Sequence, residues 1–413
     1  EMAAETGRPV AVVGSGPAGL LAAYDLRVQG HGVTVFDAES APGGMLRWAI
    51  PEFRLPVDVL EQELNLLERM GVEFRCGVKI GQDKPLASLA NEFHAVVFAT
   101  GCSEHGQLNI EGEDNPGIYH GLPFLKDVRN GISPPVGKNV LVIGGGNVAV
   151  DAAQTALRLG AEAVTMVSLE SEKELPAIPG AVESALSEGI KLECSWGNPT
   201  LSIQDGKLIG ADFQRCLQVF DDCGCFMPSF ESCELNYLEA DTIVIAIGQQ
   251  ADREFFQSMG LMQDDALTVD PLTLQAKEEK FFVAGDAFSG PSSVIAAMAG
   301  GRQAAESVDR FLKGEHLTYG RAYPGPIETE FEIDATRGSS DARLAVQEHR
   351  PTGKGDFQEI ETGIDTEAAR REAGRCHSCG EPFGKYRTCW FCLPCEVECP
   401  HEALKVEIPY LLR

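Results

Sequence analysis

No apolar run in the sequence reaches the roughly 18 residues that a membrane-crossing helix needs. The N-terminal stretch EMAAETGRP has neither the basic nor the apolar segment of a signal peptide. Positive charge is also scarce: 34 Lys and Arg residues stand against 62 Asp and Glu residues, and the formal net charge of −28 repels phosphate backbones and anionic lipid. We therefore expect a cytoplasmic protein without membrane insertion or nucleic-acid partner, and a protein partner with a basic docking face.

The chain is long and apolar enough to be globular. Its 413 residues suffice for two or three domains, and 44% of them are hydrophobic. Strand-like runs alternate with amphipathic helical stretches from Pro9 to about Leu312, which predicts an α/β fold with parallel sheets. The chain starts with Glu1 rather than methionine and ends directly after the strand-like LKVEIPYLLR, so we expect a fragment of a longer protein.

The first chemical signature follows the strand PVAVV. The glycine-rich turn Gly14-Ser15-Gly16-Pro17-Ala18-Gly19 precedes a helix to about Gln29 and a strand that ends in Asp37. In this pattern the first glycine makes a tight turn, the second admits a pyrophosphate, the third lets the helix pack on the strand, and the terminal acid binds ribose hydroxyls. The signature predicts a dinucleotide site, and a glycine-rich turn of some other α/β protein is the alternative.

The same order of elements recurs after residue 138. Strand NVLVI leads into Gly144-Gly145-Gly146-Asn147-Val148-Ala149, in which Ala149 stands where the third glycine would be. A helix to about Leu159 and the strand AVTMV follow. Two dinucleotide folds in one chain predict two different nucleotides.

A third signature completes the first. FFVAGDAFSG followed by PSSVIAAMAGGRQAA places Asp286 at a strand end and a helix start near Ser293. A carboxylate there can hold ribityl hydroxyls, and the helix N-terminus offers positive potential to a pyrophosphate or to a reduced flavin. Together with the first signature, this pattern predicts an FAD site.

These motifs resemble the small-subunit family of NADPH-dependent glutamate synthase, which includes the flavin–pyridine-nucleotide halves of dihydropyrimidine dehydrogenase and of electron-bifurcating transhydrogenases. The resemblance covers about residues 8 to 315 and is carried most specifically by PGGMLRWAIPEFRLP, with GGGNVAVDAAQTALRLGA, IVIAIGQ and AGDAFSGPSSVIAAMAGGRQAA in the same order. By that resemblance the FAD contacts are Gly16, Pro17, Ala18, Asp37, Gly44, Leu46, Arg54, Val78, Asp286 and Val294. The pyridine nucleotide would lie over Gly146, Asn147, Val148 and Gly248.

The strand after the second loop bears on the choice between NADH and NADPH. In NADPH-using members of the family an aromatic residue and paired arginines follow this strand and hold the 2′-phosphate, whereas here Val167 is followed by Ser168, Leu169 and Glu170. A carboxylate repels a 2′-phosphate, and Ser168 or Glu170 can bond a free 2′-hydroxyl. We predict NADH preference; the alternative is that Lys173 or a distant arginine binds the phosphate.

Six of the thirteen cysteines crowd near the C-terminus. Four of them follow the bacterial ferredoxin spacing C-x-x-C-x-x-C-x-x-x-C-P, which predicts a [4Fe-4S] cluster. An earlier Cys-x-x-Cys pair leaves open a second cluster, or a structural zinc site built from two such pairs. The candidate metal ligands are Cys376, Cys379, Cys389, Cys392, Cys395 and Cys399. Elsewhere, Cys223-x-Cys225 has the wrong spacing for the usual redox pair and is interpreted as structural.

No Ser/His/Asp or paired-carboxylate constellation is present, and the eight histidines show no ligand spacing. Hydride transfer between a nicotinamide and a flavin needs close stacking rather than an acid–base pair, so no catalytic side chain is predicted.

The predicted fold class is α/β, with two interleaved Rossmann-like dinucleotide-binding domains for FAD and NAD(P) and a small C-terminal ferredoxin-like iron–sulfur segment. Residues 1–125 and 276–315 would form the FAD domain, and residues 126–275 the NAD(H) domain. Residues 316–365 are polar and rich in Gly and Pro, which indicates a linker or wrapping arm. Residues 366–413 would form the iron–sulfur segment, opening with the helix TEAARREA after an N-cap at Asp365 or Thr366.

The leading prediction is an NADH:acceptor oxidoreductase that transfers hydride between NAD(H) and FAD and relays single electrons through [4Fe-4S] to or from a protein redox partner. Dissimilatory sulfite reductase is one candidate partner by the resemblance, and a homodimer is compatible with the sequence. The alternatives are an NADPH-dependent glutamate synthase small subunit and, from another class, a non-enzymatic redox-sensing or zinc-binding scaffold. The missing arginines speak against the former, and the intact glycines, Asp37 and Asp286 speak against the latter.

Overall fold

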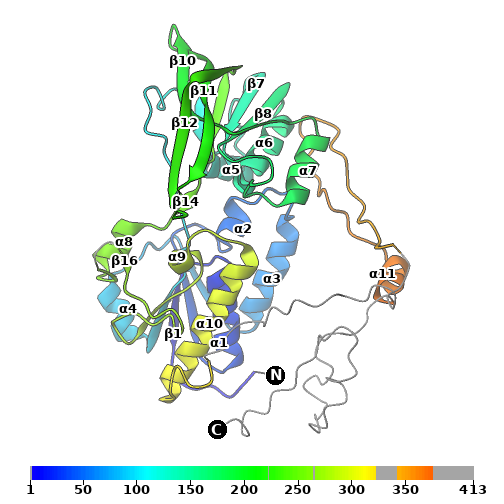
Figure 1. The fold of residues 1–413 in the computed structure, drawn as a ribbon. Helices are drawn as coiled ribbons and strands as arrows, with labels where there is room; N and C mark the ends of the chain where they lie inside the picture. Colours follow the sequence, from blue (N-terminus) through cyan, green and yellow to red (C-terminus); the bar gives the residue numbers. More distant parts are fainter. Residues whose placement is uncertain (1, 222, 264–265, 322–341, 375–413) are drawn as a thin grey trace, which may run out of the picture. The chain divides into compact units, whose positions relative to one another are not determined.

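The computed structural model describes residues 2–221, 223–263, 266–321 and 342–374 (Figure 1). The residues up to 321, together with Arg350–Glu359, belong to one compact unit, and the remaining described residues belong to a second. All six predicted cluster cysteines lie outside the described residues, so the iron–sulfur segment stays a prediction. No helix in the described ranges is both long and apolar enough to cross a membrane.

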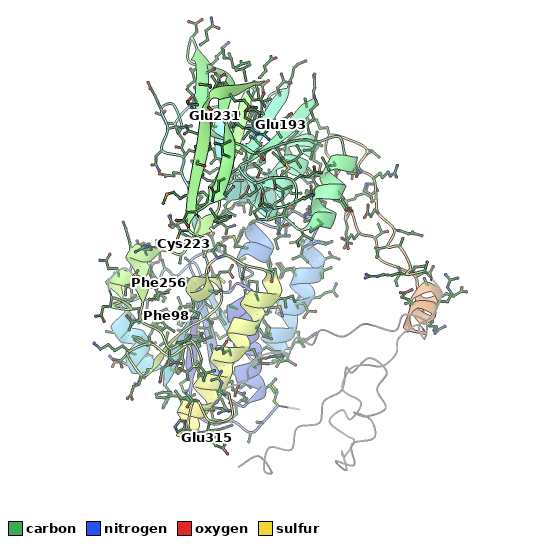
Figure 2. All side chains as sticks on the ribbon, viewed as in Figure 1. Phe98, Glu193, Cys223, Glu231, Phe256 and Glu315 are labelled. Carbon is green, nitrogen blue, oxygen red and sulfur yellow. The ribbon has the colours of Figure 1, made fainter. Side chains whose placement is uncertain are left out.

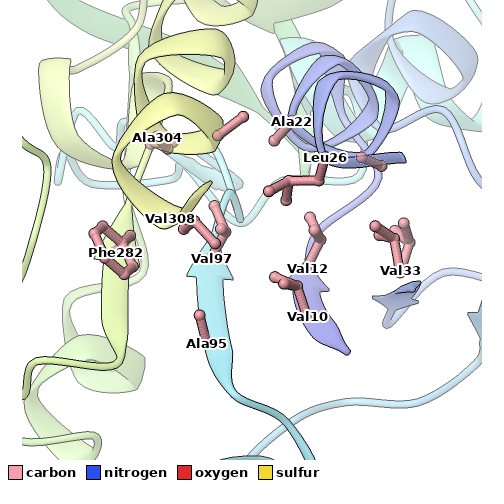
Figure 3. Close-up of a cluster of buried hydrophobic side chains, with 14 of the residues drawn as sticks. Val10, Val12, Ala22, Leu26, Val33, Ala95, Val97, Phe282, Ala304 and Val308 are labelled. Atoms are coloured by element: carbon pink, nitrogen blue, oxygen red, sulfur yellow. The ribbon is translucent and has the colours of Figure 1, made fainter. Parts of the chain in front are cut away.

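The first sheet is parallel and contains the strands of the first and third signatures. Its two central strands are buried on both faces, which explains their continuous apolar sequence. Helices α1 and α10 pack side by side over one face and enclose a core of Val, Ala and Leu side chains (Figure 3). In spatial order the strands are β17 (Phe281–Val283), β4 (Ala95–Phe98), β1 (Val10–Val13), β2 (Val33–Asp37) and β3 (Glu73–Cys76), and the two helices are α1 (Pro17–Val28) and α10 (Val294–Lys313).

The second sheet is also parallel and contains the strands that flank the second glycine-rich loop. Its helices cover one face, where Val142, Ala153 and Met166 lie in the core. In spatial order the strands are β6 (Ile118–His120), β13 (Thr242–Ile245), β7 (Asn139–Ile143), β8 (Ala163–Ser168) and β9 (Lys191–Cys194), and the helices are α5 (Gly121–Arg129), α6 (Asn147–Leu159) and α7 (Pro179–Ser187).

The chain leaves the first sheet, builds the second and returns to the first through β17. Near the two crossings, β5 (Glu104–His105) pairs antiparallel with β14 (Gln249–Gln250). This arrangement agrees with the predicted interleaving of two dinucleotide folds. The remaining short elements are α2 (Met45–Trp48), α3 (Val57–Arg69), α4 (Leu86–Glu92), α8 (Arg253–Ser258), β15 (Met262–Gln263), β16 (Ala266–Leu267) and α9 (Asp286–Ser289).

A third, antiparallel sheet covers the other face of the second sheet, where Leu208 and Phe213 pack against Leu141 and Ile243. Its strands are β10 (Trp196–Gln204), β11 (Lys207–Phe220) and β12 (Phe226–Glu239). The sequence analysis, which expected strands alternating with helices throughout this region, did not predict it.

The predicted helix after residue 364 is present in the second unit. Helix α11 spans Thr366–Ala373, and the Asp365 carboxylate caps it by accepting a hydrogen bond from the backbone N–H of Ala368 at 2.7 Å. The Arg350–Glu359 segment belongs instead to the first unit, where the Gly355 N–H donates to the Arg158 carbonyl at 2.8 Å.

The contact between α1 and α10 generates a stability prediction. In Gly301→Ala, the new methyl group would lie 2.1 Å from the carbonyl oxygen of Ala18, so one helix must shift. We expect the free energy of unfolding to fall by about 1–3 kcal/mol, as in other over-packed interiors. The matched control is Gly180→Ala in α7, where nothing lies within 4 Å of the added atom. Equal melting temperatures for the two variants in a thermal unfolding assay would contradict this close contact.

Candidate functional site

The first glycine-rich loop joins β1 to α1, and two of its glycines have no room for a side chain. A Cβ atom on Gly14 would lie 2.3 Å from the carbonyl oxygen of Ala99, and one on Gly19 would lie 2.0 Å from that of Gly14. Gly14 also has a φ of +105°, a conformation that other residues rarely adopt. These contacts hold the start of α1 against the carboxyl ends of β1 and β4.

The middle glycine of this loop is different. No heavy atom lies within 4 Å of the Cβ position of Gly16, which is the N-cap of α1 and caps it without a side-chain hydrogen bond. The first turn of α1 also carries no acidic residue. Free backbone N–H groups, the positive end of a helix dipole and open space together suit a diphosphate. The residues of this loop therefore fit the pyrophosphate of a dinucleotide.

Asp37, at the end of β2, is hydrogen-bonded to the loop itself. Its carboxylate accepts the backbone N–H of Ser15 at 2.7 Å and also the Ser15 hydroxyl. The Ser15 oxygen accepts the N–H of Gly43 at 3.0 Å, and a Cβ atom on Gly44 would lie 2.6 Å from the Cα of Gly16. The structure thus brings Gly16, Asp37 and Gly44 together in one network.

The third signature lies beside the same loop. A Cβ atom on Gly285 would lie 2.6 Å from the Cβ of Ala18, and the next residue, Asp286, begins α9. The Asp286 carboxylate accepts the Ser292 hydroxyl at 2.7 Å, and its carbonyl accepts the buried Cys102 thiol at 3.3 Å. Burial, and then the charge of Asp286, raise the pKa of Cys102 to about 11. The Cys102 thiol is therefore protonated at neutral pH and is a poor nucleophile.

Three further predicted contacts lie around the first loop. Pro17 is the first residue of α1. Leu46 lies in α2, and its N–H donates to the Gly43 carbonyl at 3.2 Å. The Val78 N–H donates to the Asp37 carbonyl at 2.9 Å.

The second loop, between β7 and α6, repeats the pattern of the first. A Cβ atom on Gly144 would lie 2.2 Å from the carbonyl oxygen of Ala246, whereas nothing lies within 4 Å of the Cβ position of Gly146. Gly146 is the N-cap of α6, again without a side-chain cap or an acidic first turn. The Asn147 side chain accepts the Ile178 N–H at 3.0 Å and so binds the start of α7 to this loop. This loop also fits a diphosphate.

A hydrogen-bonded serine and glutamate lie beside this second loop, at the end of β8. A Cβ atom on Gly145 would lie 2.4 Å from the Ser168 oxygen and 2.9 Å from Oε2 of Glu170. The Ser168 hydroxyl donates to the Glu170 carboxylate, and the Glu170 N–H donates back to the Ser168 oxygen at 3.2 Å. The structure therefore places a carboxylate directly against the backbone of the loop.

The other predicted residues occupy separate positions. Val148 is the second residue of α6, and Gly248 follows β13 with a φ of +112° while its carbonyl accepts the Gly106 N–H at 3.0 Å. Val294, the first residue of α10, is 37% exposed.

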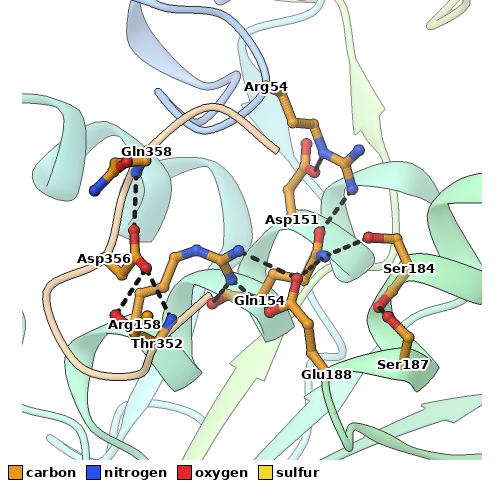
Figure 4. Close-up of polar contacts among 10 residues, drawn as sticks. All are labelled: Arg54, Asp151, Gln154, Arg158, Ser184, Ser187, Glu188, Thr352, Asp356 and Gln358. Atoms are coloured by element: carbon orange, nitrogen blue, oxygen red, sulfur yellow. Dashed lines mark hydrogen bonds and ion pairs between the residues drawn. The ribbon is translucent and has the colours of Figure 1, made fainter. Parts of the chain in front are cut away.

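Arg54 makes contacts that the sequence analysis did not predict (Figure 4). Its guanidinium forms an ion pair with Asp151 in α6 and donates to the Gln154 side-chain oxygen at 2.7 Å. Further along α6, Arg158 pairs with Glu188 at 2.7 Å. The PEFRLP segment is therefore bound to the helix that begins at the second loop. The predicted role of Arg54 as an FAD contact stays a proposal.

Asp151 is almost completely buried in this network. Burial outweighs the attraction of Arg54 and raises the pKa of Asp151 to about 6. At neutral pH the attraction between Arg54 and the Asp151 carboxylate is therefore partly offset by the cost of removing that carboxylate from water.

Two histidine rings lie in contact, although no sequence motif predicts this contact. The rings of His105 in β5 and His120 in β6 lie 4.1 Å apart, centroid to centroid. Burial, and then His105, lower the pKa of His120. Nδ1 of His120 is buried, with no hydrogen-bond partner among the described residues. Contact between residues 15 positions apart in an irregular connection carries no periodic signal, so sequence analysis missed it.

Cys223 and Cys225 lie in the turn between β11 and β12, and both are exposed; Figure 2 labels Cys223. Their backbone N–H groups donate to one carboxylate oxygen of Asp221, at 2.9 and 2.8 Å. Both cysteines thus lie in the turn of a β-hairpin, where their N–H groups are bound to Asp221. No group of three or more metal-ligating side chains with suitable geometry occurs in the described part of the chain.

The buried carboxyl of Asp151 generates a pH prediction. Its pKa in the folded protein, about 6, exceeds the ordinary value of 3.8, so the folded state takes up a proton more readily than the unfolded chain. This group therefore adds to the free energy of unfolding as the pH falls from about 6 towards 4. In Asp151→Asn the addition should disappear, and wild type should gain about 1–3 kcal/mol relative to the variant between about pH 7 and 4.5.

Thermal unfolding of both proteins across this pH range measures the difference. Asp114→Asn, at an exposed carboxyl, is the control and should track wild type at every pH. A difference between wild type and Asp151→Asn that is constant with pH would contradict the assignment.

Comparison with known proteins bears out the fold and the resemblance. A family model described as pyridine nucleotide-disulphide oxidoreductase matches residues 8–301. The glutamate synthase [NADPH] small chain of Halomonas elongata is 33% identical over 74% of this chain and 68% of its own. The NADP(+)-dependent formate dehydrogenase subunit beta of Moorella thermoacetica is 34% identical over 91% of this chain, which spans only 55% of that relative.

A solved structure agrees at the level of the fold. FprA from Mycobacterium tuberculosis, as its His57Gln mutant, superposes with a TM-score of 0.64 at 18% identity, over 74% of this chain and 85% of that one. The predicted α/β fold with two dinucleotide-binding folds, the glutamate synthase small-subunit-like resemblance and the place in an oxidoreductase family are confirmed, and the iron–sulfur segment stays a prediction. The chain belongs to the pyridine nucleotide-disulphide oxidoreductase family.

Proposed function

We propose that this chain is an NADH:acceptor oxidoreductase that transfers hydride between NAD(H) and FAD. Electrons would pass singly between FAD and a [4Fe-4S] cluster held by the C-terminal cysteines, and from there to or from a protein redox partner. The observation that carries the proposal is the pair of glycine-rich loops, each of which opens a helix and leaves its N–H groups free beside Gly16 and Gly146.

The chain's own residues bind and orient rather than exchange protons. The first loop, with Gly14, Gly44 and Asp286 around it, would hold FAD, and the second loop, with Asn147, would hold the pyridine nucleotide. Bound FAD supplies the chemistry, because it accepts two electrons as hydride and releases them one at a time. The Arg54–Asp151 ion pair would position the second loop relative to the flavin segment.

The preference for NADH rests on Ser168 and Glu170. In the family's fingerprint, the end of the strand after the glycine-rich loop is where the adenosine ribose is read. Here that position holds a carboxylate that is in contact with the loop at Gly145 and has no ion-pair partner among the described residues. A 2′-phosphate there would meet like charge, whereas a free 2′-hydroxyl can donate to Glu170. Both relatives named above carry NADP or NADPH in their names, so on this proposal the chain differs from them in nucleotide preference.

Replacing this carboxylate should shift the cofactor preference. We expect Glu170→Arg to lower the ratio of kcat/KM for NADH to that for NADPH by at least about tenfold, equivalent to about 1.4 kcal/mol. Initial rates of ferricyanide reduction with each nucleotide provide the measurement. Glu174→Arg, at an exposed position of the same connection, introduces the same charge and should change the ratio much less.

The alternative, that Lys173 grips a 2′-phosphate, has its own test. If Lys173→Ala, rather than Glu170→Arg, changed the ratio, by weakening NADPH alone, the NADH assignment would be wrong.

The cluster proposal predicts iron and acid-labile sulfide in the purified holoprotein, at about four of each per cluster. Cys392→Ser should lower both, whereas Cys233→Ser, at an exposed position of β12, should leave them unchanged. Zinc in place of iron would favour the structural zinc alternative.

Dissimilatory sulfite reductase is the first candidate to test as the protein redox partner, because the partner on this proposal exchanges single electrons with the cluster.

A further inference from the structure

Strand β12 is a long strand at the edge of its sheet. It runs for 14 residues, Phe226–Glu239, and pairs only with β11, because the strand order is β10-β11-β12. None of its residues is buried. Its other edge therefore offers unpaired backbone N–H and C=O groups that no described residue covers.

Several large apolar side chains of β12 are exposed. Leu235 and Tyr237 are 58% and 49% exposed, and Met227, on the other side of the register shifts between β12 and β11, is 63% exposed. Leu238, by contrast, faces inward and packs against the core of the second sheet. Large apolar side chains at this level of exposure along an unpaired edge mark a surface that another chain covers.

The same strand carries three glutamates and no Lys or Arg. Glu231, Glu234 and Glu239 form no ion pair among the described residues, and Figure 2 labels Glu231 on this strand. Over residues 196–239, seven Asp and Glu residues stand against Lys207 and Arg215. Arg215 lies opposite Glu231 on the neighbouring strand, but its guanidinium is stacked over the Trp196 ring at 5.2 Å and forms no ion pair among the described residues.

The charge decides between two occupants of this edge. A second copy of the chain, pairing β12 with β12, would bring two acidic strands together within two molecules that each carry a charge of −28. Like charges on adjoining strands are destabilising. A different protein with basic side chains avoids this repulsion and gains complementary charge.

We propose that β12 is the docking edge for the protein redox partner, which adds an extended, basic segment antiparallel or parallel to it. Backbone hydrogen bonds would form along residues 229–239, since Pro228 has no N–H and marks the end of the available edge. Lys or Arg side chains of the segment would face Glu231 and Glu234, and apolar side chains would cover Leu235 and Tyr237. This inference rests on the proposed function for the existence of the partner, and adds where it binds and by what chemistry.

The test uses the tagged full-length holoprotein, expressed in its source organism and isolated with its bound proteins. Hydrogen exchange is compared between this complex and the chain alone. Backbone amides of residues 229–239 should exchange at least tenfold more slowly in the complex. The charge-reversed variant Glu231→Lys/Glu234→Lys should retain at least tenfold less of the partner, whereas the matched control Glu63→Lys/Glu68→Lys, on exposed positions of α3, should retain as much as wild type.

Protection on another surface with β12 unchanged, equal retention by both variants, or no retained partner would overturn the proposal. Light scattering gives the oligomeric state of the chain alone. If it is a homodimer and Glu231→Lys/Glu234→Lys makes it a monomer, the edge binds a second copy instead. Ferricyanide reduction by NADH should be unchanged in both variants, because neither touches the glycine-rich loops. Its absence from wild type would contradict the proposed function and not the docking edge.

Discussion

Close backbone approach at a few glycines is the constraint on which the rest of this structure depends. Gly14 meets the carbonyl of Ala99, and Gly144 meets that of Ala246, at distances that exclude any Cβ atom. In each case a neighbouring strand of the parallel sheet presses against the turn, so the following helix begins directly at the sheet edge. The result is a fixed set of N–H groups around Gly16 and Gly146, with open space in front. Two such sites in one chain are what a hydride exchange between two dinucleotides requires.

A second constraint connects the two sites. The PEFRLP segment and helix α6 come from different parts of the fold, yet Arg54 reaches Asp151 and Gln154, and Arg158 lies 4.1 Å from the Phe53 ring centroid. Because Asp151 is buried, losing its partner would leave a charge without compensation, and such contacts are costly to break. This network gives α6 a defined position relative to the PEFRLP segment, and α6 in turn begins at the second loop.

The sequence predicted the parts of the site whose requirements are local. Gly14, Gly16 and Asp37 were found because a tight turn, an open backbone and a strand-end acid occupy fixed positions along the chain. The Arg54–Asp151 pair joins residues 97 positions apart and depends on tertiary packing, so no spacing rule reveals it. The β10–β12 sheet was missed because its strands interrupt the strand–helix alternation expected of a dinucleotide fold. In β12 the half-buried positions Asn236 and Leu238 alternate with the exposed Leu235 and Tyr237, so apolar and polar residues do not alternate along the sequence as they do in an ordinary half-buried strand.

The central claim is that the two loops hold two nucleotides whose rings exchange hydride. Anaerobic addition of NADH to the purified, FAD-replete protein, followed at the flavin absorption band, tests it most directly. The account predicts rapid bleaching of the flavin by one equivalent of NADH and slower or weaker bleaching by NADPH. A flavin that neither nucleotide bleaches would contradict it.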